Sequence, residues 1–148
     1  GRGLVAALAL GAEGVQIGTR FVATLESAAH PRIKQLMVQA PDTGTLVTAH
    51  RLLPTRCLRL GPNGFVERLG DMEFHGATNE ELLAFIGSGR ARIGHLEGDL
   101  VEGEVYCGAV VGLVKDIPPA GEVVRRIMRE AEETIARLGQ RTTAHPRR

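Results

Sequence analysis

The sequence has few of the features that mark disulfide-bonded, membrane-spanning or nucleic-acid-binding proteins. Only two cysteines, Cys57 and Cys107, occur in 148 residues. They match no metal-ligand spacing and nothing supports a disulfide, so we expect a reduced, cytoplasmic chain. No apolar run approaches the roughly 20 residues of a membrane span. Lys and Arg are scattered and the net charge is +1, so neither nucleic acid nor a membrane is an expected partner.

The chain is long enough for one domain with a hydrophobic core. It begins with Gly1 instead of Met, and "GRGLVAALALGA" reads as a helix already in progress. We therefore expect the chain to be a fragment of a longer protein.

The first 20 residues predict a helix followed by a strand. "GLVAALALGA" is rich in helix formers, and Gly11 is placed for a left-handed C-terminal cap, so we expect a buried helix. "EGVQIGT" is β-branched and bounded by glycines, which favours a buried strand. At the strand end, the backbone of Gly18 and the hydroxyl of Thr19 either form an ordinary turn or hold a phosphate. Arg20 either adds charge there or pairs with Glu26.

Three further elements are predicted before residue 90. A helix starts near Pro31 and packs its apolar stripe on the preceding strand. "TLVTA" predicts a strand, Pro54 ends it, an irregular or helical piece follows, and "GPNG" is a turn. Thr78 and Glu81 predict a capping box for a helix that stops at Gly87 or Gly89. The stripe of the first helix consists of Ile33, Leu36, Met37 and Ala40.

The last part of the chain predicts a long helix after a stretch rich in glycine and acidic residues. The helix follows Pro118 and Pro119, runs to Gly139, and is followed by a disordered tail. Its apolar face consists of Val124, Ile127, Met128, Ala131, Ile135 and Leu138.

The residues give no catalytic or metal site on their own. Cys107 has no nearby base, so a small packed residue is the better interpretation. The histidines lack metal spacing and a neighbouring nucleophile, which favours structural roles, and His145 lies in the tail. The acidic cluster matches no calcium loop and predicts a solvated turn. The histidines in question are His30, His50, His75 and His95, and the acidic residues are Glu97, Asp99, Glu102 and Glu104.

Several motifs in register resemble one enzyme family. Gly1–Gly3, Ala9–Phe21 ("ALGAEGVQIGTRF") and Glu26–Lys34 ("ESAAHPRIK") resemble the flavin-dependent family of nitronate monooxygenases and flavoprotein enoyl-acyl carrier protein reductases. "TRCLR", "GRARIGHLEGDLVEGEVYCGAVVGLV" and "DIPPAGEVVRRI" are also similar to its C-terminal segment. The resemblance covers the chain to about Leu138.

The resemblance implies an α/β fold, as the C-terminal fragment of a (β/α)8 TIM barrel. Residues 1–40 would carry the eighth strand and its flanking helices, 41–138 a mostly helical C-terminal extension, and 139–148 the disordered tail. The family's proposed catalytic histidine lies upstream of residue 1. We therefore assign no catalytic residue and expect this chain to be inactive alone.

The resemblance also implies the ligands. The family binds FMN, and Gln16, Ile17, Gly18 and Thr19 match the strand end that holds its phosphate. His50 matches a region that approaches the substrate pocket in the reductase branch. Cys107 and Gly108 stand where the family more often has Gly-Gln, which weakens any role carried by that glutamine.

The leading hypothesis for function is FMN-dependent oxidation of alkyl nitronates with oxygen, in a full-length protein that forms a homodimer. The first alternative is an FMN- and NAD(P)H-dependent enoyl-acyl carrier protein reductase. "GTRF", "ESAAHP" and His50 favour this alternative, whereas "TRCLR" and "DIPPAGEVVRRI" favour the monooxygenase. A third hypothesis is a non-catalytic α/β module that completes a partner.

Overall fold

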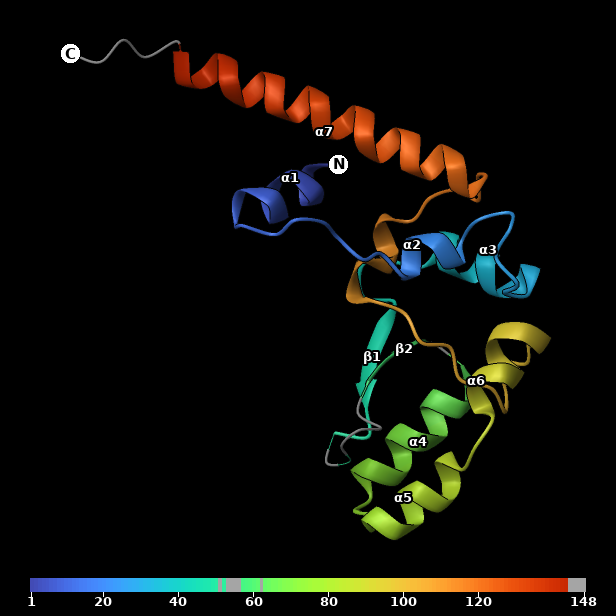
Figure 1. Ribbon diagram of the computed structural model, residues 1–148. Helices are drawn as coiled ribbons and strands as arrows, with labels where there is room; N and C mark the ends of the chain where they lie inside the picture. Colours follow the sequence, from blue (N-terminus) through green and yellow to red (C-terminus); the bar gives the residue numbers. More distant parts are fainter. Residues whose placement is uncertain (51, 53–56, 62, 144–148) are drawn as a thin grey trace. The chain divides into compact units, whose positions relative to one another are not determined.

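The computed structural model describes residues 1–50, 52, 57–61 and 63–143, which fall into two units (Figure 1). The first unit contains Gly1–Ile17 and Pro118–Arg148, and the second contains Gly18–Ile117. The two ends of the chain therefore belong to the same unit.

The first unit pairs helix α1 (Arg2–Ala9) with helix α7 (Ala120–Thr143), which lie side by side (Figure 1). Arg2 Nε donates to Glu130 Oε1 at 3.3 Å. Val5 is the one buried residue among the eight described in α1, and Leu10 just after it is 89% exposed. The prediction of a buried helix is therefore wrong for α1.

The segment between α1 and the second unit is irregular. Gly11 has φ +95°, which confirms the predicted left-handed glycine after the helix. Residues 12–18 then form neither helix nor strand, so the predicted strand "EGVQIGT" is wrong. A strand is stabilised by ladder hydrogen bonds to a neighbour, and the described residues provide none for this segment.

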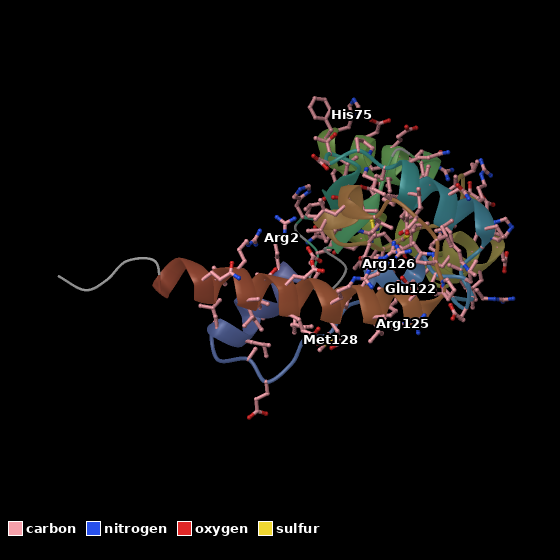
Figure 2. The ribbon with its side chains drawn as sticks, turned by 90° about the horizontal axis from the view of Figure 1, so that it is seen from above. Arg2, His75, Glu122, Arg125, Arg126 and Met128 are labelled. Carbon is pink, nitrogen blue, oxygen red and sulfur yellow. The ribbon has the colours of Figure 1, made fainter. Side chains whose placement is uncertain are left out.

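Helix α7 is longer than predicted. It continues through Gly139 to Thr143, so the first part of the predicted disordered tail is helical, and residues 144–148 lie outside the described part. Near the start of α7, Glu122 accepts hydrogen bonds from Arg125 and Arg126, and the three labelled side chains are drawn close together (Figure 2). Ala131 on the predicted apolar face is buried, but Ile135 is 55% exposed. The apolar face of α7 is thus only partly covered.

The second unit has short helices around a two-stranded antiparallel ribbon. Its described elements are α2 (Thr19–Val22), α3 (Pro31–Gln39), β1 (Thr45–Thr48), β2 (Cys57–Leu60), α4 (Gly64–Phe74), α5 (Asn79–Ile86), α6 (Arg90–Arg92), the π-helix η1 (Ile93–Glu97) and the 3₁₀-helix η2 (Ala109–Leu113).

The ribbon confirms the predicted strand β1 and adds one that the sequence analysis missed. Thr45 lies opposite Leu60 and Thr48 opposite Cys57, so the "CLRL" segment is a strand instead of an irregular piece. Tyr106 forms a bridge to Arg59 of β2. Pro54 and Pro62, which were predicted to end the strand and form a turn, lie outside the described residues.

Two hydrophobic clusters form the core of the second unit. The first cluster contains residues of α3, β2, η2 and the segment just before η2. Helix α3 therefore packs on these elements and not on a preceding strand. The second lies beneath α4 and α5. The first contains Ile33, Met37, Ala40, Leu60, Val105, Cys107 and Val111. The second contains Ala49, Leu52, Phe65, Val66, Leu69, Leu82 and Ile86.

Local capping chemistry explains where α4 and α5 begin and end. Asn63 Oδ1 accepts from Val66 N at 2.8 Å at the start of α4. The capping box of α5 is confirmed, since Thr78 Oγ1 accepts from Glu81 N and Glu81 accepts from Thr78 N. These hydrogen bonds also lower the pKa of Glu81. Gly87 ends α5 with φ +57°.

Two glycines allow a close backbone approach between η1 and the segment before Tyr106. A Cβ on Gly94 would lie 2.2 Å from the Glu104 carbonyl oxygen, and one on Gly103 would lie 2.3 Å from Gly94 N. Only glycine fits at such distances, so these two residues fix the position of Glu104. Among the described helices, none combines the length and the hydrophobicity needed to span a lipid bilayer.

Candidate functional site

Gly18 and Thr19 lie in the second unit, where α2 begins. Thr19 Oγ1 accepts a hydrogen bond from Gly108 N at 2.8 Å, which joins two segments 89 residues apart. The hydroxyl proton of Thr19 is then directed away from that bond and can be donated. A Cβ built on Gly18 meets nothing within 4 Å, so the backbone there is open. This geometry places one hydroxyl beside an accessible backbone.

The other two predicted phosphate residues, Gln16 and Ile17, belong to the first unit. Both are exposed and lie in the irregular segment. The four predicted phosphate residues are consecutive in the chain, but the boundary between the units falls between Ile17 and Gly18. Only Gly18 and Thr19 therefore share a unit with Gly108.

Arg20 is held by an ion pair inside the second unit. Its Nη2 lies 2.8 Å from Asp116 Oδ1, and its Nη1 donates to the Asp116 carbonyl oxygen at 2.9 Å. The sequence left open a role near a phosphate or a pair with Glu26. In the structure, Arg20 links α2 to the chain after η2 through Asp116.

Lys34 fixes the loop between α2 and α3. Its ammonium group is buried and donates to the carbonyl oxygens of Thr24 at 2.6 Å and Ser27 at 2.8 Å. A buried ammonium is stabilised when its donors are satisfied in this way. Lys34, the last residue of the "ESAAHPRIK" motif, thus holds the loop in which the motif begins. This role was not predicted from the sequence.

His30 caps α3, which is one of the structural roles expected for the histidines. Its Nδ1 accepts from Arg32 N at 3.2 Å, and its own backbone N donates to the His95 carbonyl oxygen at 2.7 Å. A Cβ on Gly98 would lie 2.4 Å from His30 Nδ1, so this glycine makes room for the ring. His30 therefore has a structural role.

A buried ion pair lies at the centre of the second unit. Arg59 is 0% exposed, and its Nε donates to Glu104 Oε2 at 2.8 Å. The Tyr106 hydroxyl donates to the other oxygen of Glu104, and Arg59 also donates to Thr48 Oγ1. The prediction of a solvated turn is wrong for Glu104, which the backbone approach at Gly94 carries inside.

The rest of the acidic cluster is held by arginines and backbone amides. Hydrogen bonds from Arg90 at 2.6 Å and Arg68 at 2.7 Å hold the pKa of Glu102 below its usual range. Backbone amides, including that of Glu102, likewise lower the pKa of Asp99. Among the described residues, no group of three His, Cys, Asp or Glu side chains is arranged to hold a metal ion.

His95 and Cys107 flank Tyr106. His95 Nε2 accepts from Tyr106 N at 3.0 Å. Burial lowers the pKa of His95, and the charge of Glu104 partly opposes this. Burial also raises the pKa of the Cys107 thiol to about 11. A buried, protonated thiol is a poor nucleophile, which agrees with its predicted packing role.

His50 is exposed and is one of the residues that line a pocket. Glu73 of α4 accepts from Ala49 N at 2.9 Å and from His50 N at 2.7 Å. Ala49 has φ +55°, an uncommon conformation for a residue with a Cβ. The Glu73 carboxylate also lies 3.4 Å from His50 Nδ1. Glu73 thus holds the strained turn and lies beside the imidazole.

The pocket beside His50 has a volume of about 480 Å³ and lies between β1, α4 and α5. Leu82 and Val66 form its buried floor, and Phe74, 86% exposed, stands at its rim. The sequence predicted His50 but gave no sign of Glu73, which contacts it from 23 residues away. His75 does not line this pocket, although its ring lies 5.3 Å from that of Phe74. Its Nδ1 lies 2.8 Å from the Asp71 carbonyl oxygen at the end of α4.

Comparison with known proteins identifies the class. A family profile described as nitronate monooxygenase matches residues 1–130. A nitronate monooxygenase of Neurospora crassa is 32% identical, over 93% of this chain and 37% of its own length. A carboxyl-CoA dehydrogenase of Mycobacterium tuberculosis, acting on a substituted octahydroindene, is 28% identical over 88% of this chain and 46% of its own.

A solved structure, FabK from Thermotoga maritima, has a TM-score of 0.85 and 36% sequence identity. The match covers 95% of this chain and 43% of that one. The similarities define a class of oxidoreductases, since monooxygenases and dehydrogenases both transfer electrons. The chain belongs to the nitronate monooxygenase family, and it spans less than half the length of these relatives.

Proposed function

We propose that this chain forms part of an FMN-dependent oxidoreductase that oxidises alkyl nitronates with oxygen. The family match over residues 1–130 supports the reaction class. The observation that carries the cofactor assignment is the hydrogen bond between Thr19 Oγ1 and Gly108 N. It brings the "QIGT" motif and the "GAVVGLV" motif together at the segment expected to hold a phosphate.

The residues at this point fit one edge of a phosphate. Thr19 keeps a hydroxyl proton to donate, and the open space at Gly18 leaves room for an oxygen close to the backbone. Consecutive backbone amides and hydroxyls are common phosphate ligands. Arg20 contributes its charge to Asp116, so it holds the loop in place and does not supply a free cation.

A bound flavin would supply the two-electron redox chemistry, as cofactors do in such enzymes. The residues of this chain would bind and orient it. Thr19 would donate to the phosphate, and Gly108 would hold the Thr19 hydroxyl in position. Lys34 would hold the loop between α2 and α3. In the reductase alternative, His50 would contact the substrate. We further propose that these residues complete a barrel in the full-length protein and that this chain alone is inactive.

The His50 pocket favours the enoyl-acyl carrier protein reductase as a second candidate. Glu73 places a carboxylate, 15% exposed, beside His50. An anionic nitronate would be repelled there, whereas a neutral enoyl thioester would not. The apolar floor also suits a longer substrate than a small nitronate. The similarity to FabK over 95% of this chain is compatible with either branch.

Flavin binding can be tested with a matched pair of variants. Thr19→Val removes the hydroxyl at nearly constant volume, and Thr19→Ser retains it. In the product of the complete gene, we expect Thr19→Val to weaken FMN binding about tenfold, the cost of one charge-assisted hydrogen bond. Thr19→Ser should bind within about threefold of the parent. Quenching of flavin fluorescence measures both, and equal affinities for the two variants would contradict the assignment.

The reaction can be tested with the same protein. Oxygen uptake that requires a nitronate but no nicotinamide would support the monooxygenase. Loss of NADH that requires an enoyl thioester would support the reductase and contradict the first proposal. The isolated 148-residue chain should show neither activity, and turnover by that chain would overturn its proposed inactivity.

A further inference from the structure

The pocket between β1, α4 and α5 combines an apolar interior with polar groups gathered at one end. Its volume of about 480 Å³ lies within the roughly 300–1,000 Å³ typical of small-molecule sites. The apolar walls come from all three elements: Leu46, Val47, Val66, Phe74, Ala77 and Leu82. Three of them, Leu46, Val47 and Phe74, are exposed around the opening. Exposed apolar side chains grouped around a cavity are typical of a ligand site.

The polar end of the pocket carries one hydrogen-bond acceptor and one negative charge. Glu73 Oε2 lies 3.4 Å from His50 Nδ1, which favours the tautomer with its hydrogen on Nδ1. In that tautomer, Nε2 carries no hydrogen and is a hydrogen-bond acceptor. Glu73 is also committed to the amides of Ala49 and His50. Its charge remains close to any head group that reaches His50.

We propose that this pocket binds ligands that have an apolar body and a neutral or cationic hydrogen-bond-donating head, and that it discriminates against anions. The apolar body packs on Val66 and Leu82. The head donates to His50 Nε2, and Glu73 positions the imidazole and sets the charge preference. The inference goes beyond the proposed function, since it needs only residues of the second unit and neither flavin nor turnover.

Three probes with the same skeleton separate head-group charge from apolar contact: phenethylamine, phenethyl alcohol and phenylacetate. Titration of the isotope-labelled chain, followed by amide NMR shifts, gives an affinity for each. We expect shifts at Thr48, Ala77 and Leu82. The amine should bind about tenfold more tightly than phenylacetate, since a charge pair at a partly exposed site contributes on the order of 1.4 kcal/mol. The alcohol should lie between them.

Two variants on α4 test the role of Glu73. Glu73→Gln removes the charge and should reduce the preference for the amine over phenylacetate to below about threefold. Glu67→Gln removes an exposed carboxylate from the same helix and should leave the tenfold preference intact. If Glu67→Gln reduced the preference as much as Glu73→Gln, the charge effect would be general and the proposal would be wrong.

A pocket-filling variant keeps the test valid if Glu73→Gln disturbs the turn. Gly70 lines the pocket within α4, and a Cβ there meets nothing within 4 Å. Gly70→Leu should favour the helix and abolish the shifts from all three probes. Unchanged binding in this variant, tighter binding of phenylacetate than of the amine, or no saturable shift at the pocket with the amine would each overturn the proposal.

Discussion

The two units bury the apolar side chains of their helices to different extents. In the second unit, Ile33 of α3 is 0% exposed and lies in a cluster built from several segments of that unit. In the first unit, Ile135 of α7 is 55% exposed on the predicted apolar face. Both residues are isoleucines in helices with an apolar stripe. The difference teaches that an amphipathic pattern identifies a face without showing what covers it.

The largest expected effect comes from the buried ion pair of the second unit. Arg59→Ala leaves Glu104 buried without its cation, which should lower the free energy of unfolding by about 3–5 kcal/mol. Urea denaturation monitored by circular dichroism measures this. Arg92→Ala, at an exposed pair with a 3.5 Å separation, should cost less than about 0.5 kcal/mol. A loss below about 1 kcal/mol for Arg59→Ala would show that the pair is not the centre of the unit.

The matched isoleucines test the comparison itself. Ile33→Ala should destabilise the second unit by about 2–5 kcal/mol, because it leaves a cavity in a closed cluster. Ile135→Ala should change stability by no more than about 0.5 kcal/mol, as expected of an exposed site. The same denaturation experiment serves both variants. Similar losses at the two positions would mean that the apolar face of α7 is covered in solution.

Structural features that depend on neighbouring residues could be predicted from the sequence, whereas features that depend on tertiary contacts could not. Gly11 and the Thr78–Glu81 capping box were both predictable, because each depends on a few neighbouring residues. The strand expected near Val15 was wrong, since a strand depends on a partner elsewhere in the chain.

The candidate site shows the same difference between local motifs and tertiary contacts. Thr19 and His50 were identified from motifs, and the structure gives each a specific contact. Their partners Gly108 and Glu73 were not predicted, because no local pattern connects residues so far apart. Glu104 was predicted to be solvated for the same reason: its charge suggests exposure, and only the approach of the glycine backbones carries it to Arg59.

Removal of the α5 cap should have a smaller effect. Thr78→Ala deletes the hydroxyl that accepts from Glu81 N, and we expect a loss of about 1 kcal/mol in the stability of the second unit. Thr78→Ser, which preserves the hydroxyl, should remain within about 0.5 kcal/mol of the parent. Denaturation curves for the pair would contradict the account if the alanine and serine variants were equally stable.

The smallest effect is a pH dependence at His95. Burial lowers its pKa in the folded chain, so the unfolded chain takes up a proton more readily. The associated stability is present above the unfolded pKa of about 6.5 and is lost as the pH falls through the lower folded value. His95→Gln should flatten the slope of stability against pH below about 6.5. An unchanged slope in this variant would assign the pH dependence to other groups.

Native-state hydrogen exchange tests the contrast between the units most directly. Amides of α3, β2 and α4 should exchange slowly, because they lie over the closed clusters of the second unit. Amides of α1 and residues 12–17 should exchange close to the rate of an unfolded peptide, as expected for segments with few buried contacts. Protection in α1 equal to that of α4 would contradict the account.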